Sequence, residues 1–108
     1  RKPSNRRSET TGMLRLHIQS LAEQDIIDIW LYSFENWGEQ QADRYHDKLT
    51  AAFKLIAANP EIGVSCDEVR QGYRKFPANR HMIVYRIDDA TIHIIRVLGA
   101  DMDYISRL

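Results

Sequence analysis

The pattern of hydrophobic and polar residues first has the period of a strand and then that of a helix. Apolar and polar side chains alternate in residues 14–18, which is typical of a half-buried strand. Ser20 and Glu23 have the spacing of a capping box, in which each side chain bonds a backbone N–H at the start of a helix. A helix is therefore expected to begin at Ser20 and to end at Gly38, a residue type that commonly terminates helices.

This first helix carries more apolar surface than one packing face needs. A stripe of Ile27, Leu31 and Phe34 has little left to cover it in a chain of 108 residues. A partner helix or a second copy of the chain is expected to cover it, unless residues 104–108 fold over it. A neighbouring stripe is expected to face the core, with both tryptophans buried: Ala22, Ile26, Ile29, Trp30, Ser33 and Trp37.

A second helix is expected over residues 39–58, where apolar residues from Ala42 to Ile56 recur at helical spacing. Asn59 ends it, because the residue before a proline is driven out of the α conformation. Since the connection between the two helices is so short, they are expected to lie antiparallel as a hairpin.

The remainder of the chain has the pattern of three strands. Residues 69–76 read as a strand with Arg70 and Arg74 on one side. Residues 81–87 and 91–98 are apolar on both alternating sets, which is typical of central strands, and a tight Asp-Asp-Ala turn joins them. The order β-α-α-β-β-β predicts an α+β domain in which a helical hairpin packs on a small, mainly antiparallel sheet.

Composition narrows the class of protein. The chain is 44% hydrophobic and 28% charged, which is typical of one globular domain. No apolar run approaches the roughly 20 residues that a membrane span requires, and no signal-peptide pattern is present, so a cytoplasmic location is expected. Residues 1–12 contain no aliphatic or aromatic residue and are predicted to be a flexible leader or an expression remnant before a domain of residues 13–108. A basic arm that touches nucleic acid or an acidic partner is the alternative. Cys66, the only cysteine, is expected to be a small side chain in a loop.

Charge argues against a strongly basic, RNA-cleaving protein. The formal net charge is zero, and residues 13–108 hold 11 basic and 14 acidic groups. Cationic side chains gather toward the C-terminal half, where they either share a phosphate- or carboxylate-binding surface or form local ion pairs. Arg96 interrupts an apolar strand and needs a partner, for which Asp103 and Glu68 are candidates. The cationic set is Arg70, Arg74, Lys75, Arg80, Arg86 and Arg96.

The histidines give little evidence for catalysis. None shares a spacing with carboxylates that would indicate a metal site, and no cofactor is expected. His81 is placed to act as a general base only if the protein is a nuclease. The four are His17, His46, His81 and His93.

Six segments in order resemble the ParE toxins of bacterial type II toxin-antitoxin modules, a branch of the RelE/ParE superfamily. The resemblance covers nearly all of residues 14–103 and implies a toxin that binds DNA gyrase, stabilises its cleaved DNA complex and arrests growth until an antitoxin wraps the toxin surface. A binding toxin of this kind is expected to have no enzymatic activity, and to form an oligomeric complex with its antitoxin. The segments are DIIDIW, WGEQQA, NPEIG, CDEVRQGYRKF, RHMIVYR and RVLGADMD.

The RelE branch of the same superfamily instead cuts mRNA on the ribosome, which requires a base, an acid and cations around the phosphate. Many family members have RILH where this chain has RVLG, and Gly99 offers no side chain for that chemistry. A ribosome-dependent endoribonuclease using His81, Arg86, Arg96 and Tyr104 is the second hypothesis. A degenerate member that binds only its antitoxin is the third.

Two surfaces follow from the first hypothesis. The antitoxin is expected to bind Ile27, Leu31, Phe34, Arg74 and Arg86. Gyrase or its bound DNA is expected to contact the C-terminal sheet surface: Arg70, Arg74, Arg80, His81, Arg96, Met102 and Asp103.

Overall fold

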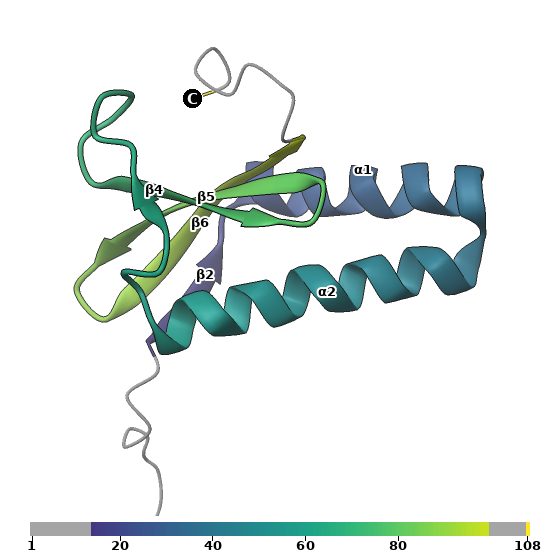
Figure 1. Cartoon of the computed structure of the whole chain (residues 1–108), viewed down its shortest axis with the longest axis horizontal. Coiled ribbons are helices and arrows are strands. Elements are labelled where there is room, and N and C mark those ends of the chain that lie inside the picture. Colours follow the sequence, from purple (N-terminus) through teal and green to yellow (C-terminus); the bar gives the residue numbers. More distant parts are fainter. Residues whose placement is uncertain (1–13, 100–107) are drawn as a thin grey trace, which may run out of the picture.

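A helical hairpin covers one face of a five-stranded sheet in the computed structural model, which describes residues 14–99 and Leu108 (Figure 1). The sheet order is β2-β6-β5-β4-β3, with β2 parallel to β6 and the other pairs antiparallel. This confirms the predicted α+β class, and the two strands expected to be central are β5 and β6. The elements are β2 (Arg15–Ile18), α1 (Ser20–Trp37), α2 (Glu39–Ala58), β3 (Val64–Ser65), β4 (Tyr73–Ala78), β5 (His81–Asp88) and β6 (Thr91–Gly99).

The predicted strand at residues 69–76 is wrong in its first half. The carbonyl of Cys66 accepts hydrogen bonds from the N–H groups of Val69 and Arg70, so the chain turns there instead of extending. The Asp67 carboxylate accepts a hydrogen bond from the N–H of Gly72 at 2.7 Å, and Gly72 has the positive φ of 85° that this turn requires. The strand β4 therefore begins only after the turn.

The capping box is also wrong, although the first helix begins where expected. Ser20 is already the first helical residue, Gln19 precedes it as the cap, and no side chain caps this end. The carbonyl of Gln19 accepts the hydrogen bond from the N–H of Glu23. At the other end Gly38 adopts a φ of 91° and joins the two helices, as its sequence position predicted.

The core lies between the hairpin and the sheet, where Leu49 and Phe53 of α2 pack with Ile83 and Tyr85 of β5. The prediction that Trp37 is buried is wrong, because its side chain is 55% exposed. The end of the hairpin that carries Trp37 projects past the sheet, so no strand is there to cover it (Figure 1). In the described part of the chain, neither helix is long and apolar enough to cross a membrane.

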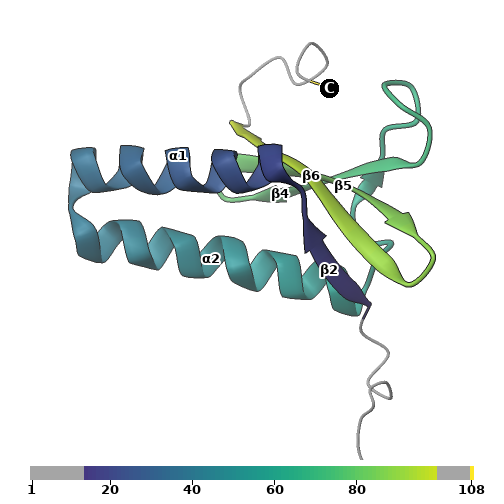
Figure 2. The ribbon, with the colours of Figure 1, turned by 180° about the vertical axis from the view of Figure 1, so that it is seen from behind.

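The edge strand β2 leads directly into α1 alongside β6 (Figure 2). Its pairing with β6 ends at Ile18 and Ile94, after which the N–H of Gln19 donates to the carbonyl of Ile94. His17 and His93 face each other across this pair, with their Nδ1 atoms 3.1 Å apart. Beyond this point α1 replaces the strand as the neighbour of β6.

Candidate functional site

Arg96 of β6 is bound by a residue of the first helix. The carboxylate of Asp25 accepts hydrogen bonds from Nε of Arg96 at 2.7 Å and from Nη2 at 2.9 Å, and it also accepts the N–H of Val97 at 2.9 Å. Both side chains are largely buried, with exposed fractions of 16% and 12%. These hydrogen bonds raise the pKa of the Arg96 guanidinium. Asp25, which sequence reasoning did not select, therefore takes the place that the edge strand vacates.

Arg74 of β4 holds the loop that follows the second helix. Its Nη1 donates to the carbonyl of Gly63 at 2.6 Å and more weakly to that of Glu61 at 3.4 Å. The buried hydroxyl of Tyr85 donates to the carbonyl of Pro60 at 2.7 Å and accepts the N–H of Gly63 at 2.9 Å. Burial raises the pKa of the Tyr85 phenol, which keeps this donor protonated. Arg74 and Tyr85 thus fix one loop from neighbouring strands.

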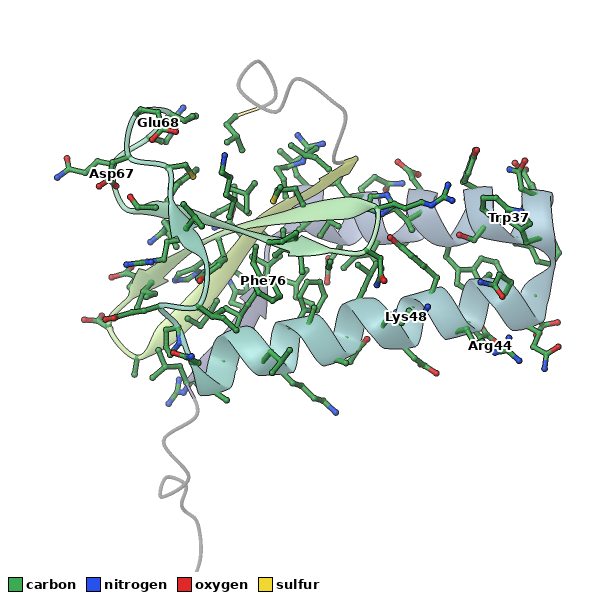
Figure 3. All side chains as sticks on the ribbon, viewed as in Figure 1. Trp37, Arg44, Lys48, Asp67, Glu68 and Phe76 are labelled. Atoms are coloured by element: carbon green, nitrogen blue, oxygen red, sulfur yellow. The ribbon has the colours of Figure 1, made fainter. Side chains whose placement is uncertain are left out.

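Two further arginines lie away from the hairpin. Arg70, in the turn before β4, donates from Nη2 to the carbonyl oxygen of Leu108 at 3.0 Å and lies over the ring of Tyr73. Arg86 of β5 is opposite Tyr73 in register and forms an ion pair with Asp88 at 3.4 Å. Their neighbouring turn carries Asp67 and Glu68, which Figure 3 shows at the opposite end of the molecule from Trp37.

The predicted cationic cluster does not form one surface. Arg74 is opposite Tyr85, whose side chain lies in the core under the helices, whereas Arg96 is opposite Val84, the adjacent residue of β5. Since adjacent residues of a strand point to opposite faces, these two arginines lie on opposite faces of the sheet. The expectation of a shared guanidinium surface is wrong for this pair. Met102 and Asp103 lie outside the described residues, as does the candidate pairing of Arg96 with Asp103.

Arg80 and His81 line a cleft of about 680 Å³ between the far half of the hairpin and the β4–β5 turn. Both helices contribute to it, with Trp37 from α1 and Lys48 from α2 (Figure 3). Arg80 and Lys48 have no ion-pair partner among the described residues. The cleft is thus cationic and aromatic, and its other lining residues are Ile29, Tyr32, Ser33, Gln41, Tyr45 and Asn79.

Tyr45 anchors the turn that forms one wall of this cleft. Its hydroxyl lies 2.6 Å from Nδ1 of His81 and 3.4 Å from the carbonyl of Ala78, and it accepts the N–H of Arg80 at 3.1 Å. Burial raises the pKa of the Tyr45 phenol, although the N–H and charge of Arg80 oppose this shift. The phenol therefore remains protonated at neutral pH and positions His81, with the direction of that bond set by the imidazole tautomer.

The side chains proposed for nuclease chemistry do not converge. His81 and Arg86 are five residues apart on one strand, roughly 17 Å at the rise of an extended chain. Arg96 is held by Asp25, and Gly99 lies directly opposite His81, so no side chain meets the imidazole from that position. Tyr104 lies outside the described residues. Residues 14–99 and Leu108 contain no group of three or more histidine, cysteine or acidic side chains arranged to hold a metal ion.

The second stripe of α1 is exposed as predicted. The side chains of Ile27, Leu31 and Phe34 are 51%, 46% and 45% exposed. Ile27 and Leu31 border a shallower groove of about 360 Å³, on the side of the hairpin away from the cationic cleft. Leu108, the one described residue of the C-terminal segment, contacts Arg70.

Comparisons with known proteins point to one family. A family model for the "ParE toxin of type II toxin-antitoxin system, parDE" matches residues 16–104. Toxin ParE1 of Mycobacterium tuberculosis (strain CDC 1551 / Oshkosh) is 40% identical over 90 residues, which cover 82% of this chain and 92% of that toxin. Toxin ParE1 of Caulobacter vibrioides is 38% identical over 82 residues, which cover 76% of this chain and 84% of that toxin. A solved structure described as "Chromosomal ParDE TA system from P. aeruginosa" shares the fold, with a TM-score of 0.73, 16% identity, and coverage of 83% of this chain and 99% of that one.

Proposed function

Because this chain belongs to the ParE toxin family of type II toxin-antitoxin systems, we propose that it arrests growth by binding DNA gyrase and stabilising the cleaved gyrase–DNA complex. In this proposal the toxin acts by binding gyrase, and it does not itself cleave nucleic acid. The observation that carries it is the separation of His81 from Arg86 and Arg96, because cleavage of a phosphodiester needs its base, acid and cations around one phosphate.

The cationic cleft is the part of the proposed target-binding region best suited to make contact. Arg80 and Lys48 bring charges that no described residue neutralises, and exposed Tyr32 and Trp37 add rings that can pack against a protein or a base. His81, which also lines the cleft, is proposed to take part in this contact. Arg70, in the turn before β4, is proposed to make a second contact away from the cleft, and Met102 and Asp103 remain in the proposed target-binding region. Arg74 and Arg96 are proposed to contribute indirectly, by fixing the loop and strand that carry the surface.

An antitoxin is proposed to neutralise the toxin by covering the stripe of Ile27, Leu31 and Phe34. Such apolar residues on a small domain commonly mark an interface, and a partner segment that folds on binding would bury them. Arg74 and Arg86 are proposed to meet acidic groups of the same partner. The complex is expected to be oligomeric.

The experiment is incubation of the purified toxin with gyrase, supercoiled plasmid and ATP, followed by denaturation of the enzyme. Linear DNA that depends on the toxin is the expected product. A parallel reaction with ribosomes and mRNA tests the RelE-type alternative. Cleaved mRNA with unaffected plasmid would show that the protein is an endoribonuclease and overturn the proposal. If neither linear plasmid nor cleaved mRNA formed, the result would favour a family member that binds only its antitoxin.

Variants locate the surface within that assay. Lys48→Ala combined with Arg80→Ala is expected to reduce linear DNA at least about tenfold, since two cations leave the cleft. Arg15→Ala combined with Lys54→Ala is the matched control, because it removes the same charge from exposed positions outside the cleft. Equal losses in both variants would remove the cleft from the proposal.

A further inference from the structure

The stripe of α1 is part of a continuous apolar patch rather than a set of scattered side chains. The ring of Phe34 stacks on that of Trp30, with centroids 5.3 Å apart and planes 9° apart. Ile27 and Leu31 line the adjoining groove together with Trp30, whose Nε1 donates to the carboxylate of Asp43 at 3.0 Å. The patch can therefore receive apolar side chains along about two turns of α1. We call it, with its rim, the stripe face.

The rim of the stripe face is acidic. The first helix contains four acidic residues and no lysine or arginine. Asp43 lines the groove from α2, and residues four before and four after it lie on the same side of that helix. The carboxylates that surround the patch by helical spacing are Glu23, Asp28, Glu35, Glu39, Asp43 and Asp47.

No lysine or arginine of the hairpin lines the groove. Lys48 lines the cationic cleft on the other side, and Arg44, four residues earlier on α2, shares its side. His46 lines the groove itself, and Lys54 is the nearest lysine or arginine on that side, roughly 10 Å along the axis beyond Asp47. Within the described chain, no lysine or arginine forms an ion pair with a rim carboxylate. The two sides of one hairpin thus have opposite charge.

We propose that the stripe face binds an amphipathic helix whose apolar residues fill the groove and whose flanks carry lysine or arginine. Burial of the apolar side chains gives affinity, and the flanking lysines or arginines are attracted to the carboxylates of the rim. A second copy of the chain is a poor occupant, because an antiparallel pairing of two α1 helices would bring Asp28 and Glu35 against the same acidic residues.

This inference deepens the proposed function and rests on it in one respect, since the antitoxin is the chain expected to supply the helix. Its acidic residues would then meet Arg74 and Arg86, and its basic residues would meet the carboxylates of the stripe face. The segment would carry its two signs of charge in separate stretches, and a wrongly paired antitoxin would bring like charges together.

The test uses two synthetic helical peptides that share leucines at i, i+3, i+4 and i+7 and carry either lysine or glutamate at every flanking position. A Trp37→Phe toxin leaves Trp30 as its only tryptophan, so that fluorescence reports on the groove. The lysine peptide is expected to bind about tenfold more tightly than the glutamate peptide, a difference of about 1.4 kcal/mol, and the difference should shrink at high salt.

Matched variants assign that binding to the stripe face. Leu31→Ser is expected to weaken binding of the lysine peptide about tenfold, whereas Leu55→Ser should not. Leu55 is a similarly exposed leucine, 52% against 46%, on the other side of α2. Asp28→Lys combined with Glu35→Lys should transfer the preference to the glutamate peptide.

Equal binding of both peptides, preference for glutamate, binding by neither, or equal effects of the two leucine variants would each overturn the inference. Separate co-purification with the product of the neighbouring gene tests the antitoxin itself. An antitoxin that binds while the peptide preference fails overturns only the inference. Failure of that product to bind overturns the proposed neutralisation, while the peptide result stands.

Discussion

Replacement of Asp25 with alanine should destabilise this toxin more than any other change to a helical carboxylate. The substitution removes both hydrogen bonds to Arg96 and leaves the N–H of Val97 without its acceptor. Breaking a buried ion pair costs about 3–5 kcal/mol, and an unsatisfied buried N–H alone costs about 1–3 kcal/mol. Since 16% of the Arg96 side chain remains exposed and can recover some hydration, we expect the lower end, about 3 kcal/mol.

Helix propensity works in the opposite direction but is too small to change the outcome. Alanine is favoured over aspartate inside a helix by at most about 0.7 kcal/mol. Asp28→Ala is the matched control, because it makes the same chemical change one turn later, where the carboxylate bonds only to Gln24 among the described residues. Its free energy of unfolding should stay within about 0.5 kcal/mol of the unsubstituted protein.

Urea unfolding followed by far-UV circular dichroism measures these differences, provided the slope against urea stays constant. Asp25→Leu combined with Arg96→Met should recover about 1–2 kcal/mol of the loss, because no charge then remains buried. If Asp25→Ala lost less than about 1 kcal/mol, or no more than Asp28→Ala, the assignment of Asp25 as the anchor of β6 would be wrong.

Three further predictions concern the core and its margins. Gly63→Ala should lower the free energy of unfolding by about 1–3 kcal/mol, because an added Cβ would lie 2.6 Å from the hydroxyl of Tyr85; calorimetry compares it with a surface substitution, and an unchanged melting temperature would contradict the packing. Trp37→Ala should lower the free energy of unfolding by less than about 1 kcal/mol and Trp30→Ala by more, although spacing alone predicts that both are buried. Chemical unfolding of the two variants measures the difference, and equal losses would contradict it. Burial raises the pKa of the Cys66 thiol, so the fold favours the neutral form, and stability present below the unfolded pKa of about 8.5 is lost as pH rises through the higher folded value. Cys66→Ala should therefore flatten the decline in stability above about pH 8.5, and an identical decline in both proteins would refute that contribution.

The order and type of the main elements could be predicted from the sequence, because they depend on local periodicity. The stripe of Ile27 and Leu31 is apolar whatever packs beside it, and the alternation in β5 and β6 is that of covered strands. Predictions went wrong where one residue type supports two structures. Asp67 and Gly72 bind each other and form a turn in a stretch whose alternation also fits a strand.

The candidate site depended on contacts between residues far apart in the chain. Tyr45 and His81 are 36 residues apart and meet only because the β4–β5 turn lies over the hairpin. A tyrosine on the core stripe of α2 gave no signal that its hydroxyl would position that turn. The cationic residues are close in sequence, yet strand alternation and turn placement send them to different faces of the molecule.

Sequence by itself determined the family, the α+β class and an apolar stripe too wide for one small core, because all three depend only on residue type and spacing. Only the tertiary structure decided what each charged side chain does. The sequence predicts that Arg96 needs a partner, and the structure gives it one in Asp25, 71 residues away. Asp25 reaches Arg96 because β2 ends and α1 begins beside β6. A charge is fixed by its residue type, whereas its energy depends on burial and on neighbours that folding brings together.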